Sequence, residues 1–139
     1  VHEWPRITSP LEAHEASTKV EHIMSTQLFT VLEKDLAMLA TSLMQWKNIH
    51  HVPVEDENGH LCGLLTWTHL VRKDKKENDP TLLVEDIMEK KVLSVLPSTS
   101  IKEAIRMMKE KEIGCLPVAV DKELVGIITI EDIIDFDHE

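Results

Sequence analysis

The sequence lacks the residues on which several classes of protein depend. Only 4 of its 139 residues are glycine, and none forms the Gly-rich loop with which nucleotide hydrolases and dehydrogenases cradle phosphate. Neither a nucleophile–base pair nor a metal box is present, so we predict no enzyme, no catalytic residue and no bound metal. No apolar run approaches the ~20 residues of a membrane-spanning helix, and we therefore expect no direct membrane insertion.

Basic residues are also scarce. Lys and Arg total 15 against 25 Asp and Glu, which gives a net charge of -10. Nucleic-acid binding depends on clustered Lys and Arg that release counterions from the phosphate backbone, so we expect no nucleic-acid partner. An anionic ligand would have to be held by a local site, because the overall field does not attract it.

Cysteine occurs only twice, as Cys62 and Cys115 in apolar, strand-like stretches where a free thiol behaves as a small hydrophobe. No signal peptide opens the sequence, so we predict unpaired thiols in a reducing compartment and a cytoplasmic location. A disulfide between them is the less favoured alternative. The sequence starts at Val1 without Met, and we expect it to be a module of a longer protein.

The sequence does contain an internal repeat. Val20–Met24 recurs as Val84–Met88 at an offset of 64, and Gly63–Thr66 recurs as Gly126–Thr129 at an offset of 63. Repeats of this length are a structural unit used twice. Two units of about sixty residues would each be marginally stable alone, so we expect them to share one core. We divide the chain into a linker (1–19), repeat 1 (20–76), a connector (77–83) and repeat 2 (84–139).

Periodicity predicts the same elements in both repeats. Leu28–Leu32 suits a strand, and apolar residues then recur at helical spacing. This helical stripe comprises Leu36, Leu39, Ala40, Leu43 and Met44 in repeat 1, and Ile101, Ala104, Ile105 and Met108 in repeat 2.

Each predicted helix leads to two strands joined by a tight turn. The strands are 51–55 and 61–66, with Asn58-Gly59 as a strong hairpin signal between them, and 115–120 and 124–129 in repeat 2. Closing helices are predicted over 68–75 and 131–136, and a short helix over 81–88. The predicted fold class is α/β (α+β), with two β-α-β-β-α units whose small sheets are covered by helices on one face.

These features together resemble the cystathionine beta-synthase (CBS) domain, and the whole resembles the tandem pair called a Bateman module. The resemblance covers Val20 to Phe136 and depends on four features: the Ile-Met openings, the amphipathic helices, the Pro-Val steps at 53 and 117, and the Gly-apolar-apolar-Thr-x-x-Asp box at 126–132. It implies a pseudo-twofold pair whose clefts bind AMP, ADP, ATP or S-adenosylmethionine as a regulatory ligand, with no obligatory cofactor. Such modules commonly form homodimers and regulate an attached or partner effector domain.

The box suggests how a ligand would be held. Thr129 lies where a strand gives way to a helix, so its hydroxyl and nearby N–H groups suit a phosphate. Asp132, one turn later, offers two acceptor oxygens to the adjacent hydroxyl groups of a ribose. The resemblance adds walls for adenine: Val92 and Leu93, from the first strand of repeat 2 around Val92 to Val95, and Ile113, Cys115, Leu116 and Pro117.

Each assignment has a simpler alternative. Thr129 and Asp132 have the spacing of a capping box that only stabilises the closing helix. In repeat 1, Thr66 is kept but His69 replaces the aspartate, and a neutral imidazole has one acceptor nitrogen, so the two clefts should be unequal. His50 and His51 stand where some family members bind ligand phosphate. In the simpler interpretation the two histidines are ordinary strand residues. A zinc site that they would form with His60 or His69 has no metal-ligand spacing to support it.

The leading functional prediction is a regulatory module that senses an adenosine compound. The alternative is a structural or dimerisation module without a ligand, which a thermal-shift series with AMP, ATP and S-adenosylmethionine would distinguish.

Overall fold

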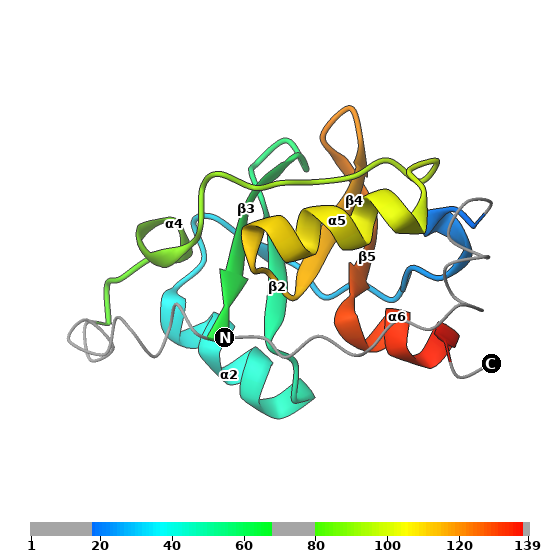
Figure 1. The fold of residues 1–139 in the computed structure, drawn as a ribbon. Helices are drawn as coiled ribbons and strands as arrows, with labels where there is room; N and C mark the ends of the chain where they lie inside the picture. Colours follow the sequence, from blue (N-terminus) through cyan, green and yellow to red (C-terminus); the bar gives the residue numbers. More distant parts are fainter. Residues whose placement is uncertain (1–17, 68–79, 138–139) are drawn as a thin grey trace. The chain divides into compact units, whose positions relative to one another are not determined.

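The chain forms two compact units. The protein is represented by a computed structural model, which describes residues 18–67 and 80–137 (Figure 1). Unit 1 comprises Val1–Leu28 with Leu93–Glu139, and unit 2 comprises Phe29–Val92. Neither unit coincides with one sequence repeat. The first residues of repeat 1 belong to unit 1, which contains most of repeat 2, and the first residues of repeat 2 belong to unit 2, which contains most of repeat 1. The predicted closing helix of repeat 1, His69 and residues 1–17 of the linker lie outside the described residues.

Unit 2 is built on a sheet of order β1-β2-β3, from β1 (Val31–Leu32), β2 (His51–Glu55) and β3 (Leu61–Thr66). The first strand runs parallel to β2, and β2 runs antiparallel to β3. An isolated antiparallel bridge joins Leu64 of β3 to Glu89, just after α4 (Val84–Ile87). Unit 2 also contains α2 (Ala37–Lys47). The buried core of unit 2 comprises Val31, Ala37, Ala40, Met44, Val52, Val54, Leu65, Val84 and Ile87.

Unit 1 repeats this arrangement with β4 (Cys115–Val120) and β5 (Glu123–Thr129) as an antiparallel pair. Single bridges extend the pair on both sides: Val95 is parallel to Val118, and Ser25 is antiparallel to Ile127. Among its described residues, unit 1 contains the helices η1 (Val20–His22), α5 (Ile101–Lys111) and α6 (Ile130–Asp137). The buried core of unit 1 comprises Val20, Val95, Ile101, Ala104, Ile105, Met108, Leu116, Val118, Ile128 and Ile133.

The opening segments of the two repeats are exchanged between the units. In Figure 1, η1 lies beside the start of α5, where the N–H of Val20 donates to the carbonyl of Thr99 over 2.8 Å. Reciprocally, the N–H of Val84 donates to the carbonyl of Asp35 over 2.8 Å. The expectation of one shared core is therefore wrong for the described residues. They form two cores, and each small unit gains apolar area from the opening segment of the other repeat.

This exchange explains two glycines of the repeat. A Cβ atom at Gly63 would overlap Sδ of Met88, and one at Gly126 would lie 2.6 Å from Sδ of Met24. Each glycine lies in a strand that the methionine of the other repeat crosses closely. The Ile-Met openings and the Gly-containing boxes, which the sequence shows as separate motifs, are thus two halves of one contact.

The helical stripe predicted for repeat 2 is confirmed, since all four of its residues are buried. The side chain of Ser100 begins α5 by accepting a hydrogen bond from the N–H of Glu103 over 3.1 Å. In repeat 1 the prediction is wrong at Leu39, which is 61% exposed. The prediction is confirmed at Ala40 and Met44, which are buried with Ala37, while Leu36 and Leu43 are partly buried. The apolar residues of this helix extend around its circumference, so their spacing does not fully specify which face packs.

The predicted strands around the hairpins are confirmed, and the first strands are shorter than predicted. The strand expected over Leu28–Leu32 is limited to Val31–Leu32, and the one around Val92 to Val95 is reduced to a single bridge at Val95. The β2–β3 turn has Gly59 at φ +78°. Asp56 Oδ1 organises the turn by accepting hydrogen bonds from the N–H groups of Asn58 and His60, over 2.9 and 3.0 Å.

Candidate functional site

Thr129 and Asp132 form a reciprocal capping box at the junction of β5 and α6. The N–H of Thr129 donates to Oδ2 of Asp132 over 2.9 Å, and the N–H of Asp132 donates to Oγ1 of Thr129 over 3.2 Å. The capping arrangement considered from the sequence is therefore present. It fixes the Asp132 carboxylate against the first turn of α6.

The box leaves one carboxylate oxygen available. Within the part of the chain that the structure describes, Oδ1 of Asp132 accepts no hydrogen bond, and the side chain is half-buried. Burial raises the pKa of Asp132 above its ordinary value, and the hydrogen bonds from Thr129 oppose that shift. Burial also makes an ionised carboxylate a stronger acceptor for hydroxyl groups that approach it, because less water competes.

Fewer N–H groups are available for a phosphate than the sequence suggested. The N–H of Thr129 is used by the capping box, and the N–H of Ile130 donates to the carbonyl of Gly114 over 3.1 Å. The same connection occurs in unit 2, where the N–H of Trp67 donates to the carbonyl of His50 over 3.0 Å. Sequence reasoning missed this anchor, although position 50 corresponds to position 114 at the repeat offset of 64.

The predicted adenine walls in unit 1 follow β4. Cys115 lies opposite Thr129 in the strand register, and Pro117 follows on the same face; both side chains are buried, but neither belongs to the core of unit 1. Burial raises the pKa of the Cys115 thiol to about 12, so the thiol is neutral and apolar at physiological pH. Leu116 points to the other face and is fully buried in the core, which leaves only its backbone for a ligand. Ile113, before the strand, is partly buried.

The remaining predicted residues belong to unit 2 or to the boundary between the units. His51 lies opposite Thr66 in the register of β2 and β3, and both are partly buried, whereas His50 is exposed. Val92 is the last residue of unit 2, and Leu93, which is exposed, is the first residue of the second segment of unit 1. The structure therefore groups the predicted residues into two sets, one on each unit.

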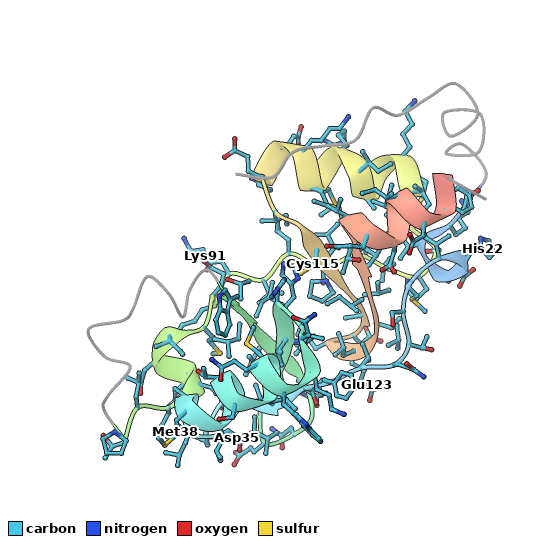
Figure 2. All side chains as sticks on the ribbon, turned by 90° about the horizontal axis from the view of Figure 1, so that it is seen from below. His22, Asp35, Met38, Lys91, Cys115 and Glu123 are labelled. Atoms are coloured by element: carbon cyan, nitrogen blue, oxygen red, sulfur yellow. The ribbon has the colours of Figure 1, made fainter. Side chains whose placement is uncertain are left out.

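The described residues contain neither a metal-binding cluster nor a membrane-spanning helix. Across residues 18–67 and 80–137, no three His, Cys, Asp or Glu side chains are grouped so as to hold a metal ion. None of the helices in those residues is long and apolar enough to cross a membrane. Cys62 and Cys115 are both free thiols, and Cys115 is labelled in Figure 2 at the start of β4.

Comparison with known proteins assigns the repeats. A family model described as the CBS domain matches residues 20–76 and 84–139. The chain belongs to the CBS domain family. Homoserine O-acetyltransferase from Methanococcus vannielii is 33% identical over 116 residues, which are 82% of this chain and 24% of that protein. This chain thus spans about a quarter of that relative, and similarity to a named enzyme does not extend to the whole enzyme.

Solved structures of CBS proteins share the fold and include complexes with adenosine compounds. CBSX2 in complex with AMP is 26% identical, with a TM-score of 0.79 over 86% of this chain and 96% of that one. The CBS domain pair of protein MJ0100, in complex with 5-methylthioadenosine and S-adenosyl-L-methionine, is 28% identical, with a TM-score of 0.75 over 86% of this chain and 94% of that one. The chain is thus a tandem CBS pair of mixed α and β structure.

Proposed function

We propose that this chain is a non-catalytic regulatory module that binds an adenosine compound, AMP, ADP, ATP or S-adenosylmethionine, through Thr129 and Asp132. The observation that carries the proposal is the open Oδ1 of a half-buried Asp132, whose other oxygen is held by the N–H of Thr129. The adenosine complexes of CBSX2 and the MJ0100 pair support the ligand class.

The capping box prepares Asp132 for this role. A ribose presents two neighbouring hydroxyl donors, and Oδ1 offers two lone pairs in a position that the cap has already fixed. Hydrogen bonds to an ionised acceptor contribute about 1.5–3 kcal/mol each. Because the carboxylate loses little freedom on binding, more of that energy appears as affinity. Cys115, Pro117 and Ile113 would form the apolar wall for adenine, and His50, His51 and Thr66 of unit 2 are candidates to contact a second ligand.

Regulation requires that the ligand bind two states of the protein with different affinity. We propose that the chain acts as a homodimer and transmits ligand binding to an effector domain, attached or separate. We place it in the cytoplasm, where its two free thiols would remain reduced. The alternative, a structural module without a ligand, is favoured by one observation: the capping box already satisfies the N–H groups of Thr129 and Asp132.

Calorimetric titration of the full chain with AMP, ATP and S-adenosylmethionine tests the proposal. The parent should bind one equivalent tightly, at Asp132, because repeat 1 has His69 in the corresponding position. Asp132→Asn keeps a carbonyl oxygen to cap Thr129 and removes the charge. It should retain the helical circular dichroism of the parent and lose roughly ten- to a hundredfold in affinity.

Asp86→Asn is a matched control, because Asp86 caps α4 in the same way by accepting from the N–H of Leu83 over 2.9 Å. It should leave affinity unchanged. Unchanged binding in a well-folded Asp132→Asn would restrict Asp132 to its capping role, and absence of binding to the parent would favour the structural module.

A further inference from the structure

The start of α6 is acidic. Glu131, Asp132 and Asp135 follow directly after the end of β5, where Figure 1 shows α6 continuing from the strand. On a helix of 3.6 residues per turn these three positions lie within about 100° of one another, so the carboxylates share one side of α6. We call Glu131 and Asp135 the acidic flank, because they lie on either side of Asp132 in the sequence.

Within the described residues, no cation pairs with this side of α6. Neither the acidic flank nor Asp132 takes part in an ion pair there. Acidic residues near the start of two other helices are paired: Glu85 of α4 lies 2.9 Å from Nζ of Lys34, and Glu103 of α5 pairs with Arg106. The acidic flank therefore keeps its full negative charge.

The repeat provides an internal comparison for these positions. At the offset of 63, Glu131 corresponds to Thr68 and Asp135 to Arg72 in the sequence, so one copy of the repeat has no acid at either position. An acidic residue in the first turn stabilises a helix through its dipole, but that effect fades beyond the first turn, and Asp135 lies in the second. Like charges four residues apart are destabilising on a helix. Neither the repeated fold nor the stability of α6 therefore accounts for both acids.

The charge of the acidic flank reaches the proposed ligand site. Burial is the largest cause that raises the pKa of Asp132, and the charges of Glu131 and Asp135 raise it further. Burial also raises the pKa of the Cys115 thiol, and the charge of Glu131 adds to that effect. The flank thus acts on the carboxylate proposed for the ribose and on the wall proposed for adenine.

A phosphate at this junction would find few partners. The N–H groups of Thr129, Ile130 and Asp132 are already used within the protein. A phosphate monoester carries a charge of about −1.5 to −2 at neutral pH, and proteins hold such a group with cationic side chains or several free N–H groups. The start of α6 presents carboxylates without paired cations instead.

We propose that the acidic flank selects the ligand of the Thr129–Asp132 site by charge. The site accepts an adenosine compound whose 5′ group is neutral or cationic, such as a 5′-thioether nucleoside or the sulfonium S-adenosylmethionine, and disfavours AMP, ADP and ATP. All of these compounds share the adenine and the ribose diol, so Glu131 and Asp135 discriminate only at the 5′ group. This inference rests on the proposed function, since it assumes that adenosine compounds bind through Asp132.

Calorimetric titration of the full chain with a series of ligands tests the charge selection. Adenosine and methylthioadenosine, which are neutral, should bind with similar affinity, and S-adenosylmethionine should bind at least as tightly. AMP should bind roughly tenfold more weakly than adenosine, and ATP more weakly still. Raising the salt concentration from about 0.02 to 0.2 M should narrow the difference between AMP and adenosine, because salt screens repulsion between exposed charges.

Substitutions in the acidic flank test which residues discriminate. Glu131→Gln and Asp135→Asn remove charge with little change of size, and each should raise the affinity for AMP relative to adenosine by roughly threefold. Glu131→Lys should raise it further. Glu123→Gln is the control, because Glu123 lies at the other end of β5, about 20 Å from Thr129 at ~3.3 Å per residue. Figure 2 labels Cys115 and Glu123 at opposite ends of the β4–β5 hairpin. This control should leave the ratio of the two affinities unchanged.

The outcomes separate this inference from the proposed function. Binding of AMP as tightly as adenosine in the parent, or a ratio of affinities that Glu131→Gln, Asp135→Asn and Glu131→Lys all leave unchanged, would overturn the charge selection and leave adenosine binding intact. Absence of binding by every compound in the series would overturn the proposed function, and the charge selection with it. Circular dichroism of each variant should match that of the parent, which shows that α6 still forms.

Discussion

Replacing Gly63 with alanine tests the exchange of opening segments between the two units. Gly63 lies within β3 and its φ is not in the left-handed region, so alanine is compatible with the backbone. In an ordinary strand this change would be neutral or stabilising, by up to about 1 kcal/mol, because alanine loses less conformational entropy on folding. Here the new methyl group would overlap Sδ of Met88 and lie 3.0 Å from its Cγ. We therefore expect destabilisation by about 1–3 kcal/mol from overpacking.

The new methyl group would clash with a flexible side chain, so a second substitution at Met88 can relieve the destabilisation. Met88→Ala removes the overlapping atoms, so Gly63→Ala should be much less harmful in that background. The resulting coupling energy should be about 1–2 kcal/mol in a double-mutant cycle measured by urea unfolding. At the equivalent Gly126 the Cβ atom would also lie 3.1 Å from the carbonyl oxygen of Ser25. That oxygen is fixed by a 3.0 Å hydrogen bond from the N–H of Ile127, so Met24→Ala should rescue Gly126→Ala only in part.

A stabilising Gly63→Ala, or a cycle without coupling to Met88, would refute the exchange. Equal rescue at the two glycines would show that the Ser25 carbonyl yields as easily as a side chain.

Three further predictions concern stability. Glu112 has the left-handed φ of 53° that Asn48 adopts at the corresponding helix end, so Glu112→Gly should raise the free energy of unfolding by up to about 1 kcal/mol, and Asn48→Gly by less. The thiols of Cys62 and Cys115 have pKa values raised from 9.0 to about 12 by burial. The thiols ionise first in the unfolded chain, so their contribution to stability should be constant below about pH 9 and should be lost as the pH rises from 9 to 12. The free energy of unfolding should fall over that range, less steeply in Cys115→Ala. A fragment Val1–Lys76 lacks α4 and should show no cooperative unfolding in urea.

The local elements were accessible from sequence because their signals are local. Apolar spacing placed α5, Asn58-Gly59 placed a hairpin, and the spacing of Thr129 and Asp132 indicated a capping box. Each depends on contacts within a few residues along the chain. The capping box and the ligand site use the same two residues, and the open Oδ1 of Asp132 became apparent only from the hydrogen bonds.

The outer face of α2 shows where periodicity is insufficient. Its sequence contains apolar residues around most of the helix, and the spacing predicted a buried stripe of Leu36, Leu39, Ala40, Leu43 and Met44. The structure buries Ala40 and Met44 together with Ala37, leaves Leu36 and Leu43 partly buried, and exposes Leu39 and Trp46. Small residues allow a helix to approach a sheet closely, and that choice is made by the packing surface rather than by the helix.

The sequence by itself determined that a unit is used twice, which elements each copy contains and to which family they belong. Only the tertiary structure decided which sheet each opening segment joins. Val20–Met24 and Val84–Met88 are nearly identical, and Gly63 and Gly126 offer each methionine the same space. An opening segment would therefore make the same local contacts with the sheet of its own repeat as with the sheet of the other repeat. The choice depends on non-local hydrogen bonds, such as those that link Ser25 to Ile127 and Glu89 to Leu64, and these form only when the chain is folded.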